Sequence, residues 1–190
     1  IKSYTYYKKA IELVQPLMDK TLLAELYFNY ALCCDDLDET EEAVLYYRKC
    51  SEIDKNNPHL ASALSNLALI FDETGMSELA IKYYQKSLDI DEQNNNNSGI
   101  YSSALKLAEM TSRQDPDKAE GFFKKAIKSS SLLGDKTYKS AAYLEYGDSF
   151  MNHRNIKQAL KCYVIALHSV ENNKDLKQKI LQRLKDLKIR

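Results

Sequence analysis

The sequence contains little of what interrupts a helix and little of what builds an active site. Its 190 residues include 5 Gly, 3 Pro and no Trp. Because Pro and Gly end helices, such low numbers favour long helices joined by tight turns. The sequence has no Gly-rich phosphate loop, and no pair of carboxylates stands in an apolar setting as a general acid and base would. We therefore predict that the chain is not an enzyme.

An excess of charge of one sign is also missing. Lys and Arg together number 27, as do Asp and Glu, so the formal net charge is zero. Phosphate binding needs a basic excess or a strong basic patch, which excludes nucleic acid as the main partner. No apolar run approaches the roughly 20 residues of a membrane span, and no secretory signal is recognisable, so we expect a cytoplasmic protein. The start at Ile1 rather than Met predicts a fragment of a longer protein.

Cysteine and histidine are few and scattered. The four cysteines lack the spacing of a metal site or of a disulfide framework, which indicates a reducing compartment. The three histidines lie far apart in the sequence, and we expect no catalytic role, metal or cofactor. These residues are Cys33, Cys34, Cys50 and Cys162, and His59, His153 and His168.

One pattern recurs along the chain: a small residue, an aromatic residue four positions later, and a second small residue after three more. Successive occurrences are 37, 39 and 40 residues apart. Internal periods of this size indicate stacked helical repeats. The four occurrences are Ala43, Tyr47 and Cys50; Ala80, Tyr84 and Ser87; Ala119, Phe123 and Ala126; and Ala159, Tyr163 and Ala166.

Residues 60–92 show the pattern most fully, with helical spacing of apolar residues on both sides of Gly75. The first half carries Leu64, Leu67, Ala68 and Phe71, and the second carries Ala80, Tyr84 and Ser87. This stretch resembles a tetratricopeptide repeat, although the Trp and the closing Pro frequent in that family are absent. The spacing also exceeds the usual period of about 34 residues. The resemblance implies an all-α fold, a right-handed α-solenoid of stacked antiparallel helix pairs.

On this basis we predict one solenoid domain over residues 1–190. Residues 3–14 would be the second helix of a truncated repeat, and residues 175–188 a capping helix with one apolar stripe. Gly75 would take the left-handed helix end, and Ser77, Asp115 and Asn155 would be N-caps, with Pro116 opening its helix. The four complete repeats would span residues 21–55, 60–92, 99–131 and 137–170.

In this family the first helix of each repeat, helix A, lines a concave groove, and the resemblance implies the same here. A second stripe of residues on each helix A, rotated away from the core stripe, would then face a bound peptide. The predicted groove residues are Glu25, Phe28, Asn29, Leu32, Asp36, Ser65, Asn66, Leu69, Glu73, Leu105, Lys106, Glu109, Leu144, Glu145 and Asp148.

Asn29 and Asn66 occupy equivalent places in neighbouring repeats, and a side-chain amide can both donate to and accept from a peptide backbone. The groove is more acidic than basic, which favours a partner with basic and apolar side chains. We therefore predict a non-catalytic protein-interaction scaffold that binds a peptide segment. Two alternatives stay open: the ligand-sensing region of a bacterial peptide-responsive regulator, and a homo-oligomerisation module that uses exposed solenoid ends.

Overall fold

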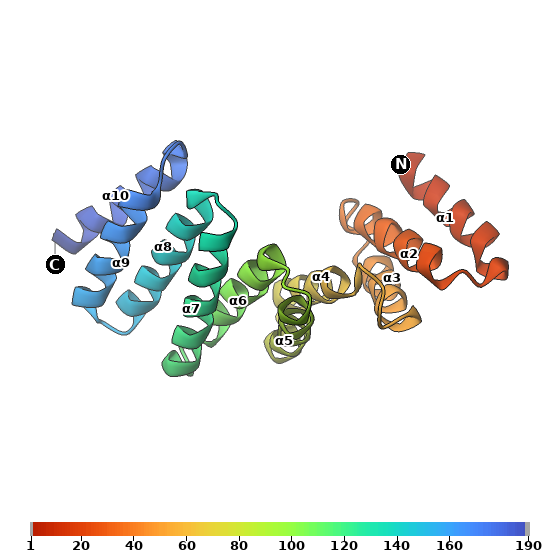
Figure 1. Cartoon of the computed structure of the whole chain (residues 1–190), viewed down its shortest axis with the longest axis horizontal. Coiled ribbons are helices and arrows are strands. Elements are labelled where there is room, and N and C mark those ends of the chain that lie inside the picture. The colour runs from red at the N-terminus through yellow and green to blue at the C-terminus, as the bar shows by residue number, and fades with distance from the viewer. Residues whose placement is uncertain (1, 189–190) are drawn as a thin grey trace. The chain divides into compact units, whose positions relative to one another are not determined.

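The structure, a computed structural model, describes residues 2–188, and helices are the only regular structure in that range. The predicted all-α fold class is confirmed. Figure 1 shows consecutive helices joined by short loops. The predicted domain of residues 1–190 includes positions 1, 189 and 190, which lie outside the described residues. Its extent as one domain stays a prediction.

Two compact units divide the chain, Ile1–Ile90 and Asp91–Arg190, and the division falls inside helix α5. In the first unit, α2 packs against α1 and α3, and α3 packs against α4. In the second, α6 through α10 pack in sequence order, each on the next. The elements are α1 (Lys2–Val14), the 3-10 helix η1 (Gln15–Leu17), α2 (Lys20–Asp35), α3 (Thr40–Ile53), α4 (Leu60–Glu73), α5 (Ser77–Gln93), α6 (Asn97–Thr111), α7 (Pro116–Leu132), α8 (Lys136–Asn152), α9 (Ile156–Ser169) and α10 (Lys174–Lys188).

The turn between α4 and α5 depends on Gly75, whose φ of 78° lies in the left-handed region. The N–H of Met76 donates to the carbonyl of Phe71 at 2.7 Å, and the N–H of Gly75 donates to that of Asp72 at 3.0 Å. This pair of bonds satisfies two carbonyl groups that the end of a helix leaves free. The predicted left-handed helix end at Gly75 is confirmed. Arg154, with φ of 58°, holds the corresponding place between α8 and α9.

Side chains cap several helix starts. Asp115 accepts from the N–H of Lys118 at 3.0 Å, with Pro116 as the first helical residue, and Asn155 accepts from the N–H of Gln158 at 3.3 Å. Both predicted N-caps are confirmed. The N-cap prediction for Ser77 is wrong, because Ser77 is the first residue of α5. The carbonyl of Met76 already accepts the intrahelical bond from the N–H of Ala80, which makes Met76 the capping position.

The recurring small–aromatic–small pattern forms the core of each helix pair. All twelve of its residues are at most 2% exposed. The small members let helices approach closely: the Ser87 hydroxyl of α5 donates to the carbonyl of Ala61 on α4 at 2.9 Å. The Ser140 hydroxyl of α8 donates to the carbonyl of Ala166 on α9 at 2.8 Å. The pattern therefore marks where the backbones of paired helices come close together.

Gly147 shows how close that approach is in the last pair. A Cβ atom at this position of α8 would lie 2.4 Å from Cε1 of Tyr163 on α9. That distance is far inside van der Waals contact, and the Tyr163 ring is 1% exposed and surrounded by core. Glycine is required here for packing, since any side chain would force the two helices apart.

Helix α10 covers the end of this stack. Ile180 is fully buried, and Leu176, Leu184 and Leu187 pack beside it against Tyr163 and its neighbours. The predicted apolar stripe of the closing helix therefore lies where expected, in a cluster with residues of α8 and α9. The structure places these four side chains in contact with the last repeat.

Candidate functional site

The predicted groove residues belong to two helices in each compact unit, and each unit is considered by itself. In the first unit all of them are at least partly accessible. They are Glu25, Phe28, Asn29, Leu32 and Asp36 on α2, and Ser65, Asn66, Leu69 and Glu73 on α4. Leu32 and Leu69 are each 36% exposed, so each of the two helices leaves an apolar side chain accessible to solvent.

Phe28 is already engaged within the protein. Its ring stacks on the imidazole of His59 with centroids 4.8 Å apart, and lies 5.9 Å from the ring of Tyr47. These contacts fix the Phe28 side chain between α2 and the start of α4. It can offer one edge to a ligand without losing rotamer freedom on binding.

Asn66 also has an internal partner. Its side-chain N–H donates to the hydroxyl oxygen of Tyr47 at 3.0 Å, and the Tyr47 ring is fully buried. Burial, and next the charge of Asp35, raise the pKa of this hydroxyl. A sequence-based view of Asn29 and Asn66 as equivalent free amides is therefore wrong for Asn66, because a tyrosine from α3 reaches it. Asn29 is half-buried on α2.

This difference gives a prediction for folding. Asn66→Ala is expected to lower the free energy of unfolding by about 1 kcal/mol, because the buried Tyr47 hydroxyl loses a hydrogen bond. Asn29→Ala is expected to stay within about 0.5 kcal/mol of the parent. Urea denaturation of the two single variants measures both effects. Equal losses in the two variants would contradict the role given to the Asn66–Tyr47 bond.

Acidic side chains gather at the C-terminal ends of α2 and α4. Burial raises the pKa of the Asp35 carboxyl, and the nearby charges of Glu73, Asp36 and Asp38 raise it further. Like charges held together in this way cost free energy unless a cation approaches them. This edge of the first unit is therefore acidic, with like charges held close together.

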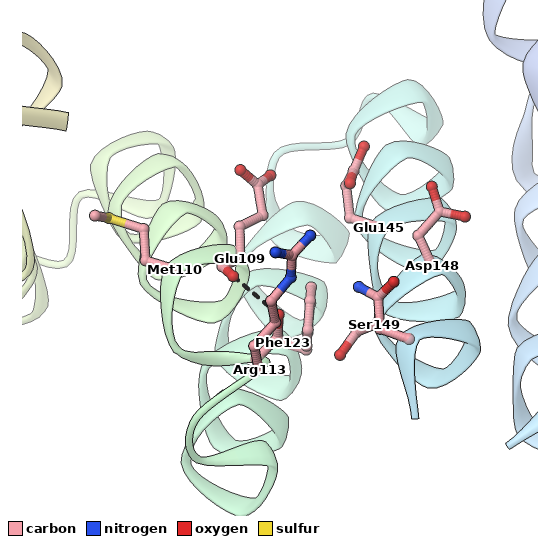
Figure 2. A pocket seen from close by; sticks show the side chains of 9 residues that line it. Glu109, Met110, Arg113, Phe123, Glu145, Asp148 and Ser149 are labelled. Atoms are coloured by element: carbon pink, nitrogen blue, oxygen red, sulfur yellow. Dashed lines mark hydrogen bonds between the residues drawn. The ribbon is translucent and has the colours of Figure 1, made fainter. Parts of the chain in front are cut away.

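In the second unit, α6 and α8 border a cleft of about 400 Å³. Figure 2 shows Glu109 reaching it from α6, Arg113 from the turn after α6, and Glu145, Asp148 and Ser149 from α8. Three of the predicted groove residues, Glu109, Glu145 and Asp148, thus lie on one cleft, which Arg113, Phe123 and Asn152 also line.

The remaining predictions for this unit fare differently. Lys106 lies on α6 beside the cleft and forms an ion pair with Glu109 at 3.5 Å. Leu105 is half-buried on the same helix. Leu144 is only 5% exposed and belongs to the core cluster of α8, α9 and α10. Its side chain is therefore not available at the surface, because the closing helix and α9 bury that side of α8.

Glu145 is half-buried where it lines the cleft. Burial raises its pKa first, and the charges of Glu109 and Asp148 add to the rise, while those of Arg183 and Lys106 partly offset it. Ionised Glu145 is therefore less favourable than an isolated surface carboxylate. A cation that entered the cleft would relieve this cost, which is the electrostatic basis for binding a basic side chain.

Asp148, in contrast, is already paired. The Arg183 guanidinium of α10 donates to both of its carboxylate oxygens, from Nε at 2.8 and 3.1 Å and from Nη2 at 3.1 Å. The Tyr163 hydroxyl donates to Oδ1 at 2.6 Å. Asp148 therefore holds α8, α9 and α10 together as well as lining the cleft. Sequence reasoning missed Arg183; the available signal was an Arg in a helix otherwise rich in Lys, since Arg is the residue suited to two-pronged carboxylate pairing.

A metal site and a membrane-spanning helix find no support among the described residues. Within residues 2–188, no cluster of three or more His, Cys, Asp or Glu side chains has the arrangement to hold a metal ion. In the same range, every helix is too short or too polar to cross a membrane.

Comparison with known proteins identifies the repeats. The family model described as a tetratricopeptide repeat matches residues 24–57 and 61–94. These two segments are tetratricopeptide repeats. The matched ranges cover most of α2 with all of α3, and nearly all of α4 with all of α5; the sequence predicted complete repeats over 21–55 and 60–92. The search of curated proteins gave no match.

Solved structures share the helical fold over most of the chain. The crystal structure of BtubC (BKLC) from P. vanneervenii is similar with a TM-score of 0.76 at 17% identity, covering 98% of this chain and 85% of that one. The apo form of RapI is similar with a TM-score of 0.54 at 19% identity, covering 94% of this chain but 62% of RapI. At these identities the likeness shows the fold alone, a helical solenoid.

Proposed function

We propose that this chain is a non-catalytic protein-interaction scaffold whose second unit holds a basic side chain of a partner peptide in the cleft between α6 and α8. Tetratricopeptide repeats are a scaffold family, so the fold favours interaction over catalysis. The observation that carries the proposal is the raised pKa of Glu145, which lies with Glu109 on an open cleft. Free thiols at all four cysteines suit a cytoplasmic setting.

The arrangement of charges supports a cationic ligand group at one end of the cleft. Figure 2 shows the Glu109 and Glu145 side chains on facing helices, with the Arg113 guanidinium between those helices. Asp148 is neutralised by Arg183, whereas burial and neighbouring acids disfavour ionised Glu145. A lysine or arginine of the partner would therefore gain most at Glu145. Apolar residues beside it would contact Met110, which is half-buried at the cleft.

The predicted groove of the first unit fits the same class of ligand. Leu32 and Leu69 are exposed there, and Asp35, Asp36 and Glu73 form an acidic edge. We propose that this surface, taken by itself, also binds a peptide segment with basic and apolar residues. The roles of peptide-responsive regulator and of homo-oligomerisation module stay predictions.

One variant tests the proposal through two opposite effects. Glu145→Gln is expected to weaken binding of a basic peptide by about tenfold, because a charge pair in a partly dry cleft is lost. The same variant is expected to be more stable at neutral pH. A carboxyl whose folded-state pKa is raised contributes its full stability only below its unfolded pKa, about 4.3, and loses it as pH rises through the folded pKa. The gain from Gln should therefore disappear below about pH 4.

The measurements use peptides that are selected from a random displayed library for binding to the full chain. Titration calorimetry gives the affinity. Thermal melts at pH values from 3 to 8, about one pH unit apart, give the stability. Asp117→Asn, an exposed acid in the first turn of α7, is the control for charge alone. Selected peptides without enrichment in Lys or Arg, or equal losses of affinity in Glu145→Gln and Asp117→Asn, would refute the proposed cleft.

A further inference from the structure

Helix α9 carries an apolar stripe that faces away from the core. Ile156 is 47% exposed, Leu160 45% and Val164 38%, and Ile165 beside them is also 38% exposed. The first three are spaced four residues apart, so they lie on one face of the helix. A row of branched apolar side chains at this exposure is unusual for a surface with no partner.

Comparison with the other repeats shows that the fold does not require apolar side chains at Val164 and Ile165. Val164 and Ile165 stand five and six residues after the first small residue of the pattern, Ala159. In every other repeat these two places hold cationic or amide side chains. The equivalents are Arg48 and Lys49, Gln85 and Lys86, and Lys124 and Lys125. The apolar side chains at these two places are thus particular to α9, whereas the place of Leu160 also holds an apolar residue, Val44 or Ile81, in the first two repeats.

Helix α10 continues this face. Leu181 is 38% exposed, and with Leu184, Leu187 and Lys185 it borders a groove of about 490 Å³ against Ile156 and Leu160 of α9. The groove is lined by five apolar side chains and one lysine. A hollow between two packed helices accepts the side-chain ridge of a third helix, which is the usual way an amphipathic helix docks.

The surroundings of this groove are strongly basic. Helix α9 carries two lysines and no acid, and α10 carries six cationic residues and two aspartates, so the two helices together have a net charge of +6. Of the cationic residues of α10, Arg183 forms an ion pair with Asp148 of α8. Lys157 and Lys161 flank the apolar stripe of α9, and Lys185 flanks that of α10. Two copies of such a face would repel each other, whereas an acidic partner would be attracted.

We propose that the α9–α10 groove is a second interaction site, which docks an acidic amphipathic helix of another protein. The apolar stripe of that helix would fill the groove between Leu160 and Leu184, and its Glu or Asp residues would meet Lys157, Lys161 and Lys185. This ligand is opposite in charge to the one proposed for the α6–α8 cleft. The second unit would thus bring together a basic segment and an acidic helix on separate surfaces.

The test uses the full chain and a displayed library of helical peptides of about 18 residues, five turns long. Each peptide has apolar residues at the three-and-four spacing and a random choice of Glu, Lys, Ala or Gln elsewhere. We expect selection to enrich Glu over Lys, and the best peptide to bind about tenfold more weakly to Leu160→Ser. Lys157→Glu with Lys161→Glu should weaken it as much, and added salt should reduce the binding of the parent.

A matched control is Leu45→Ser, because Leu45 on α3 is 48% exposed and Leu160 45%. It should bind the peptide as the parent does. Equal losses in both variants, no enrichment of Glu, or failure to select any peptide would overturn the proposal. Self-association that Leu160→Ser abolishes would assign the groove to a second copy of the chain. If the parent binds vesicles rich in phosphatidylserine and Leu160→Ser does not, the groove would be assigned to a membrane surface. Either result also overturns the proposal.

Discussion

Phe123→Ala is expected to lower the free energy of unfolding by about 3–5 kcal/mol, the range for removing a buried phenylalanine side chain. Phe123 on α7 is 1% exposed and stacks on Tyr146 of α8, with ring centroids 4.7 Å apart. The ring thus joins the third repeat to the fourth. Its loss leaves a cavity at the contact that couples two helix pairs. Urea denaturation followed by circular dichroism measures the change.

The form of the transition is informative as well. In stacked repeats, stability is a sum of repeat terms and interface terms, so a broken interface can let part of the chain unfold first. We expect Phe123→Ala to show a broader transition, or two. Lys124→Ala, at the exposed neighbouring position, is the control and should unfold like the parent. An unchanged midpoint for Phe123→Ala would mean that the assignment of the repeat core is wrong.

Removal of α10 is expected to have the second large effect. A chain that ends at Asn173 loses Ile180, Leu176, Leu184 and Leu187, and exposes the cluster around Tyr163. Burial of one large aliphatic side chain contributes about 1.5–3 kcal/mol, so the loss should amount to several kcal/mol and promote aggregation. Thermal melts and sedimentation of the truncated and parent chains test this.

Two point variants in the whole chain separate packing from length. Ile180→Ala should cost about 2–5 kcal/mol, because Ile180 is fully buried. Leu181→Ala, at the neighbouring position that is 38% exposed, should cost far less. A truncated chain that melts and sediments like the parent would show that α10 is not a structural cap.

The helices were predictable because the residues that determine each helix lie close together in the sequence. The expected terminal helix 3–14 is found as Lys2–Val14, and the capping helix 175–188 as Lys174–Lys188. Apolar spacing, Gly75 and the Asp115 cap act within a few residues of one another, so a linear reading captures them. Ser77 was misplaced by one position because the choice between two adjacent capping residues depends on backbone geometry that the sequence does not show.

The site was less predictable because its decisive contacts join distant residues. Arg183 and Asp148 are 35 positions apart, and Tyr47 and Asn66 are 19 apart. Helical spacing places Asn66 and Leu144 on the outer stripe of their helices. It does not predict which side chains of neighbouring helices will contact them. Leu144 is buried by α9 and α10, and Asn66 is bonded by a residue of α3. Spacing gives the face of a helix, whereas tertiary packing decides whether that face is free.

The buried cysteines make the chain its own reporter of local opening. Burial raises the pKa of the Cys50 thiol to about 12, and burial is likewise the main cause that raises the pKa of Cys34 and of Cys162 to about 11. At neutral pH such thiols hold almost no thiolate, the form that alkylating reagents attack. Each therefore reacts only after its own helix pair opens. Cys34 and Cys50 record the first unit and Cys162 the second, so the order of alkylation follows the order in which the repeats open.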